Sequence, residues 1–158
     1  MEKIKSFCVY FWAVVLIVVD QIVKVAVVTN IKDDAITIIK GILRFSYCEN
    51  EGVAFSIGNG HVPVFIVLNL LMICGLVVFY ERNKKDFNLV NKIFFTMVIA
   101  GGTSNLIDRA FRGYVIDFID VGELFDFAIF NVADIFIVCG IIGLVISMFV
   151  SEFRKKDK

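Results

Sequence analysis

Four long apolar segments constrain this chain more than any other feature of its sequence. They run over residues 7–28, 62–80, 89–107 and 129–150. Each has about 19–22 residues, enough for an α-helix to cross a hydrocarbon core of about 30 Å. Lipid offers no water to backbone amides, so spanning segments of this kind are helical. The pattern predicts a mainly α membrane protein, a bundle of four transmembrane helices within a single domain, residues 1–158.

Composition supports this fold class. Hydrophobic residues make up 59% of the 158-residue chain, and the mean hydropathy is +0.85, whereas soluble domains have about 45–50% apolar residues. The formal net charge is zero, which argues against a nucleic-acid partner, because such proteins carry a basic excess. Three of the four cysteines lie in apolar runs and no pair has metal-ligand spacing, so we expect neither a disulfide framework nor a metal or cofactor.

Basic residues predict the orientation of the spans. Residues 1–6, 81–92 and 151–158 together hold ten of the sixteen Lys and Arg residues, although the connections 29–61 and 108–128 are longer. Positively charged loops remain on the cytoplasmic side of a membrane. Both termini should therefore be cytoplasmic. The first apolar segment resembles a signal peptide but has no A-x-A-like cleavage site, so we interpret it as a retained span.

The first outer connection is too long to be a simple turn. Residues 36–39 and 43–47 have the composition of short strands, residues 53–56 could form a third, and residues 58–60 are a turn signal. A small extracytoplasmic β-sheet cradle is therefore expected over residues 33–60.

Polar residues are concentrated toward the predicted outer ends of three spans. Ionisable groups at such depth are costly and usually face a protein interior or a wet cavity. Residues three or four apart share a helix face, so Asp20 should pair with Lys24. The full set is Asp20, Lys24, Asn105, Asp108, Arg109, Asn131 and Asp134.

Asp117 and Asp134 are the candidate catalytic pair. Asp117 has apolar neighbours within an otherwise polar outer loop, which suggests that it folds back toward the membrane. Asp134 lies about five residues into its predicted span, about 7 Å below its start. Two carboxylates held close together share a proton, so one can activate water while the other donates to a carbonyl. Alternatively, Asp117 is an ordinary loop carboxylate and Asp134 pairs with Arg109 or Lys24.

Other features have simpler explanations. The Asp20–Lys24 pair is interpreted as structural, Gly101 and Gly102 as a site of close helix packing, and His61 as solvated. Buried acids also suit a proton- or ion-transport protein, although the inner halves of the spans are almost entirely apolar. A structural membrane assembly factor is a third reading, which the gathering of acids at one depth disfavours.

Five stretches of this chain together resemble the lipoprotein signal peptidases, the type II signal peptidases of bacteria. They follow one another in the family's order from the first span to the last. The stretches are residues 20–24 (DQIVK), 50–55 (NEGVAF), 101–109 (GGTSNLIDR), 113–118 (GYVIDF) and 130–134 (FNVAD).

The resemblance implies an intramembrane aspartic endopeptidase without a cofactor, with Asp117 and Asp134 as the catalytic aspartates. It also implies an extracytoplasmic cradle and a short mobile helix over the site. Two positions depart from the family's pattern: Ser104 replaces a usual Gly, and Val53 a common Ala. The supporting or substrate-binding positions that it implies are Asp20, Lys24, Asn50, Gly52, Asn105, Asp108, Arg109 and Asn131.

The implied substrate is a prolipoprotein carrying diacylglycerol on a cysteine, cleaved just before that cysteine. A substrate anchored in this way presents its scissile bond near the outer membrane surface. We therefore expect a bacterial cytoplasmic-membrane enzyme, monomeric and in contact with lipid, with its active site near the extracytoplasmic face.

Overall fold

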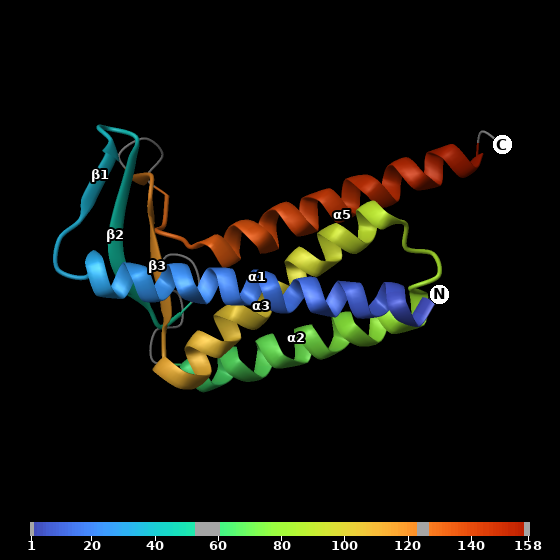
Figure 1. Ribbon diagram of the computed structural model, residues 1–158, viewed down its shortest axis with the longest axis horizontal. Coiled ribbons are helices and arrows are strands. Elements are labelled where there is room, and N and C mark those ends of the chain that lie inside the picture. The colour runs from blue at the N-terminus through green and yellow to red at the C-terminus, as the bar shows by residue number, and fades with distance from the viewer. Residues whose placement is uncertain (1, 53–60, 123–126, 157–158) are drawn as a thin grey trace.

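The computed structural model describes residues 2–52, 61–122 and 127–156 and consists of long helices with a small sheet at one end (Figure 1). The helices run alongside one another, and both chain ends lie at the end opposite the sheet. The helices are α1 (Glu2–Asn30), α2 (Val62–Asn83), α3 (Leu89–Arg112) and α5 (Val132–Lys156), and the strands are β1 (Ile36–Ile39), β2 (Leu43–Asn50) and β3 (Val115–Asp120).

Each predicted span corresponds to a long helix. Within the described residues, three helices are long and apolar enough to cross a membrane: α1, α2 and α5. The fourth, α3, contains more polar residues. It packs against all three others, and its buried positions include Asn91, Thr96, Ser104, Asn105 and Asp108. A helix surrounded by protein does not need the apolar surface that lipid demands.

The last helix begins later than predicted. Its first residue is Val132 rather than residue 129, because Phe130 is extended and pairs with Ile119 of β3. The Phe130 carbonyl accepts hydrogen bonds from the N–H groups of Phe118 at 3.0 Å and Ile119 at 2.8 Å. Apolar composition extends across this boundary, so hydropathy alone cannot locate it.

The sheet is antiparallel with strand order β1-β2-β3. The predicted strand at residues 36–39 is confirmed, and the strand predicted at 43–47 continues to Asn50. Strand β3 was not predicted; it pairs with β2 and places Asp117 opposite Cys48 and Val115 opposite Asn50. The strand predicted at 53–56 and the turn at 58–60 lie outside the described residues, and the cradle predicted over 33–60 also requires β3.

Gly113 makes the sharp turn from α3 into β3 possible. Its φ of +83° is left-handed, and its N–H donates to the Arg109 carbonyl at 3.2 Å, closing the helix. Glycine adopts this conformation without the steric cost that other residues pay. The strand begins two residues later, which places Asp117 beside the C-terminal end of α3.

Two apolar clusters hold these elements together. Tyr80, Phe87 and Phe95 are the large members of the cluster that joins α1, α2 and α3. Val27 and Ile31 of α1 pack against Ile116 and Phe118 of β3 in the second. A fully buried side chain of this size contributes about 1.5–3 kcal/mol, so the second cluster fixes the sheet to the end of α1.

Candidate active site

A cavity of about 470 Å³ opens among α3, α5 and β3. Polar groups from four elements line one part of its wall: Asn50 of β2, Asn105 and Arg109 of α3, Asp117 of β3 and Asp134 of α5. The rest of the lining is largely apolar. The fold thus brings the two predicted acids, from segments predicted separately, to one concave surface.

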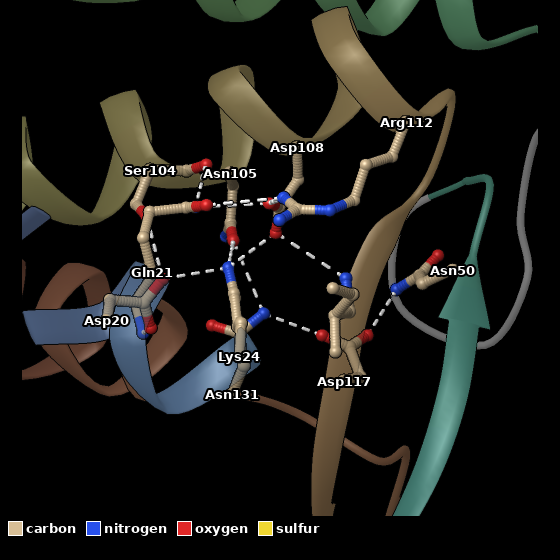
Figure 2. A network of polar contacts seen from close by, with 12 residues as sticks. Asp20, Gln21, Lys24, Asn50, Ser104, Asn105, Asp108, Arg112, Asp117 and Asn131 are labelled. Carbon is tan, nitrogen blue, oxygen red and sulfur yellow. Dashed lines mark hydrogen bonds and ion pairs between the residues drawn. The ribbon is translucent and has the colours of Figure 1, made fainter. Parts of the chain in front are cut away.

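Asp117 is the more deeply buried of the two acids, with 2% of its surface exposed. Its carboxylate accepts hydrogen bonds from Asn131 Nδ2 at 2.6 Å and Asn50 Nδ2 at 2.8 Å (Figure 2). Burial raises the pKa of Asp117 to about 6, and the negative charge of Asp134 adds to the increase, against the opposing effect of the amide donors. This residue is therefore not a solvated loop carboxylate.

Asp134 is the third residue of α5, not the fifth of a span as predicted. Its Oδ2 accepts from the Asn131 N–H at 3.1 Å, while Asn131 Oδ1 accepts from the Asp134 N–H at 2.9 Å. This reciprocal pair is a capping box. Asn105 Nδ2 donates to the other oxygen, Oδ1, at 2.8 Å. The start of α5 therefore fixes the orientation of the carboxylate as well as its position.

Asn131 connects the two acids. Its side chain donates to Asp117 and accepts from the backbone of Asp134, and it also donates to Asn105 Oδ1 at 3.3 Å. It is fully buried, so little solvent competes for these bonds. Its position immediately before α5 explains this dual role, because an asparagine there caps the helix.

A buried cluster of charges, Asp20, Lys24 and Asp108, lies on the same polar network as Asp117 and Asn131 (Figure 2). Lys24 Nζ lies 2.8 Å from Asp20 and 2.7 Å from Asp108, and all three side chains are fully buried. The predicted Asp20–Lys24 pair is confirmed. Lys24 also donates to Asn105 Oδ1 at 3.0 Å, so the cluster contacts the residue that orients Asp134.

Arg109 points in a different direction from Asn105 and Asp108. Its guanidinium donates to the Gly52 carbonyl at 2.7 Å and lies 5.9 Å from the centre of the Phe65 ring. The Gly52 N–H in turn donates to Asn50 Oδ1 at 3.0 Å. Arg109 thus joins α3 to the end of β2 on the cavity wall.

The alternative ion pairs do not form. Among the described residues, no salt bridge joins Asp134 to Arg109 or Lys24. Lys24 instead pairs with two other acids, and Arg109 bonds to a carbonyl. Asp134 accepts neutral donors from Asn105 and the helix backbone.

Three members of the polar network were not predicted. Gln21 Nε2 donates to Ser104 Oγ at 2.9 Å and Asp108 Oδ1 at 3.0 Å, and Arg112 contacts Asp108. The spacing of Asp108 and Arg112 could have revealed that pair, since residues four apart share a helix face. Gln21 and Ser104 carry no comparable signal, because single uncharged polar residues are common at helix contacts.

Long apolar helices with charges buried at one end define a helical membrane protein. The family model described as signal peptidase (SPase) II matches residues 12–150. The chain therefore belongs to the signal peptidase II family, a family of proteases, as the resemblance in its motifs indicated.

Known relatives are similar in sequence to this protein over nearly its whole length. A lipoprotein signal peptidase of Fusobacterium nucleatum subsp. nucleatum is 31% identical over 150 residues, 94% of this chain and 90% of that protein. One from Staphylococcus aureus is 32% identical over 148 residues, 92% of this chain and 90% of its own.

Solved structures show the same fold. One, described as a bacterial membrane enzyme determined by the in meso method at 2.3 Å, superposes with a TM-score of 0.83 at 30% identity, covering 96% of this chain and 93% of its own. A second, at 1.9 Å, gives 0.77 at 30% identity, covering 89% and 92%.

Proposed function

We propose that this protein is an intramembrane aspartic endopeptidase that removes the signal peptide from diacylglyceryl-modified prolipoproteins. Cleavage occurs immediately before the lipidated cysteine. Membership in the signal peptidase II family supports the reaction class. The observation that carries the aspartic mechanism is that Asp117 and Asp134 line one cavity and both bond to Asn131.

The two carboxyl groups divide the chemistry of hydrolysis. Asp117, with its raised pKa, carries the shared proton, and Asp134 takes a proton from the attacking water. The water oxygen bonds to the scissile carbonyl carbon while Asp117 protonates the carbonyl oxygen. Collapse of the tetrahedral gem-diol breaks the C–N bond as the proton on Asp134 passes to the leaving amine, and one hydroxyl proton of the gem-diol returns to Asp117. The pair titrates as one unit.

The remaining site residues orient the acids or the substrate. Asn105 and Asn131 hold the carboxylates by direct hydrogen bonds, and Asp20, Lys24 and Asp108 support Asn105 from behind. Asn50, Gly52 and Arg109 lie at the end of β2, where an extended substrate peptide would pass. Their amide, carbonyl and guanidinium groups are of the kind that hydrogen-bonds substrate backbone or lipid ester groups.

The apolar part of the cavity wall suits a lipid-anchored substrate. Ile135, Val138 and Cys139 of α5 line the cavity together with Phe127. An acyl chain or an apolar signal-peptide segment could pack there while the scissile bond reaches the acids. Such a wall would give little discrimination among water-soluble peptides.

We further propose that the protein is a monomer in the bacterial cytoplasmic membrane, with four spans, including α3, in a single domain. Both chain ends are cytoplasmic, and the sheet and active site lie at the extracytoplasmic face. The two termini lie at the same end of the molecule, opposite the sheet (Figure 1), which supports this orientation. The distribution of Lys and Arg supports it independently.

The central test replaces each acid with its isosteric amide. Asp117→Asn and Asp134→Asn should lower kcat/KM on purified, diacylated precursor by about 10²–10⁴-fold, as expected for loss of an acid or base. Asp120→Asn is the matched control, because Asp120 lies on the same strand but bonds to Arg44 and Gly122. Near-normal turnover by either folded dyad variant would refute the aspartic mechanism.

The substrate proposal has a separate test. Wild-type enzyme should cleave diacylated precursor much faster than the same precursor without lipid, measured in the same bicelles. Equal rates for the two substrates would contradict the lipid requirement while leaving the aspartic mechanism intact.

Membrane orientation is tested by thiol labelling. In a variant with the four native cysteines replaced by alanine, Lys40→Cys should react with a membrane-impermeant maleimide in whole cells. Lys85→Cys, in the connection between α2 and α3, should react only after permeabilisation. The reverse pattern would invert the proposed topology.

A further inference from the structure

The peptide groups of Ala133, the residue immediately before Asp134, are held from two directions. Its N–H donates to Asp20 Oδ1 of α1 at 2.9 Å. Its carbonyl oxygen lies against Gly101 of α3, so closely that a Cβ on Gly101 would overlap it. Ala133 itself is fully buried. The first turn of α5 is thus fixed by two other helices at one residue.

Asp20 is in turn held in a single orientation. Its other oxygen, Oδ2, accepts from Ser104 Oγ at 2.6 Å and from Lys24 Nζ at 2.8 Å. Gln21 donates to Ser104 Oγ at 2.9 Å, which leaves the hydroxyl proton directed at Asp20. Ser104 and Asp20 are fully buried, so no water competes for these bonds.

Asp20 therefore acts as a cap supplied by another helix. The first N–H groups of a helix have no partner within it. In α5, Asn131 accepts from the Asp134 N–H, and Asp20, 113 residues away in sequence, accepts from that of Ala133. A carboxylate at a helix N-terminus is also favoured by the helix dipole. The bond fixes α5 both along its axis and about it.

We propose that Asp20, Ser104 and Gly101 are positioning residues that fix the Ala133 peptide groups and thereby place the Asp134 carboxylate opposite Asp117. This inference rests on the proposed catalytic role of Asp134. Catalysis depends strongly on such placement, since a misplacement of about 1 Å can cost about 100-fold in rate. Ser104 thus has a task in this chain that a glycine at the same position could not perform.

The first experiment compares two glycines of the same helix interface. A Cβ on Gly101 would lie 2.8 Å from Ile137 Cγ1 in addition to its overlap with Ala133, and one on Gly140 would lie 2.7 Å from Val98 Cγ2 and 2.8 Å from the Phe94 carbonyl. Gly101→Ala and Gly140→Ala therefore both disturb α3–α5 packing, each by a clash with a backbone carbonyl and a side chain of the facing helix. Only Gly101 lies beside the residue before Asp134.

Gly101→Ala should lower kcat on diacylated precursor by about tenfold or more at little-changed KM. Gly140→Ala should lower the thermal midpoint while the folded enzyme keeps its kcat. Equal kcat values for the two variants, or a loss confined to KM, would overturn the proposal.

The second experiment removes only a hydroxyl. Ser104→Ala should lower kcat by about two- to tenfold, the range of one buried hydrogen bond. Thr96→Val is its control, because the buried Thr96 hydroxyl on the same helix bonds to the Lys92 carbonyl of that helix. A purely structural role of Ser104 would leave the pH profile of kcat/KM unchanged. If Asp134 instead moves away from Asp117, its charge raises the pKa of Asp117 less, and the basic limb of the profile should move to lower pH.

The two hypotheses fail differently. An active Asp134→Asn variant would refute the catalytic assignment itself. An inactive Asp134→Asn variant together with Ser104→Ala and Gly101→Ala variants of unchanged kcat and pH profile would refute only the positioning role.

Discussion

Asn131 donates its side-chain amide to Asp117 at 2.6 Å from a position that also caps the helix carrying Asp134. One residue thus sets the relation between a strand and a helix that are separate in sequence. The two tasks can be separated experimentally, because they use different atoms of the amide group.

Asn131→Ala should remove both tasks, while Asn131→Ser should retain only the cap. Serine is a good N-cap residue, so this variant should recover most of the about 0.5–2 kcal/mol that alanine loses. Its shorter side chain cannot also reach Asp117, so its kcat should remain low. Thermal unfolding and kinetics on the same preparations measure the two effects. Full recovery of kcat by Asn131→Ser would show that the contact with Asp117 is dispensable.

The raised pKa of Asp117, about 6, predicts how stability varies with pH. The folded protein binds this proton more tightly than the unfolded chain, whose aspartates titrate near 3.8. Its contribution is fully present below about pH 3.8 and is lost as pH rises through about 6. A difference of about two pKa units corresponds to about 3 kcal/mol.

Asp117→Asn should therefore be more stable than the wild type at pH 7.5, and the difference should vanish near pH 4. Thermal unfolding in detergent at the two pH values checks this. Asp120→Asn should change stability at pH 7.5 in the opposite direction, because the Gly122 N–H and Arg44 lower the pKa of Asp120. A gain for Asp117→Asn that is equal at both pH values would contradict the raised pKa.

Activity should also depend on the Asp117 proton. As pH rises above about 6, the free enzyme loses the proton that the mechanism donates, and kcat/KM should decrease. The measurement is a pH profile with diacylated precursor in buffers of constant ionic strength. A profile that stays flat from pH 5 to 9 would exclude Asp117 as the general acid.

Lys24 forms ion pairs with two buried acids at once, Asp20 and Asp108. Lys24→Met should destabilise the protein by about 3–5 kcal/mol, since it leaves buried charge without its partner. Combining it with Asp20→Asn and Asp108→Asn should recover part of that loss, because the uncompensated charges are then gone. If Lys24→Met alone unfolds at the wild-type temperature, the ion pairs of Lys24 do not stabilise the protein.

Arg109 should affect substrate binding more than chemistry. It bonds to the Gly52 carbonyl and stacks near Phe65 rather than touching either acid. Arg109→Gln should therefore raise KM by about tenfold, the effect of losing one charged hydrogen bond, with a smaller change in kcat. Arg112→Gln is a suitable comparison, because Arg112 contacts Asp108 on the far side of the network. A loss confined to kcat would assign Arg109 to the chemical step instead.

The sequence by itself determined the helices and the chemical groups. Apolar length located all four long helices, and Ile36–Ile39 was recognisable as a strand, because these features depend on local composition and periodicity. The Asp20–Lys24 pair was also predictable, since a spacing of four residues defines a helix face. The family motifs then identified Asp117 and Asp134 as the acids to examine.

Only the tertiary structure decided which groups meet. The strand β3 was missed because its pairing partners in β2 lie about 67 positions away, as in the Asn50–Asp117 contact. The start of α5 at Val132 depends on the pairing of Phe130 with Ile119, and the bond from the Ala133 N–H to Asp20 spans 113 residues. Local preferences cannot specify such contacts, because they arise only when helices and sheet pack together and buried polar groups must find partners.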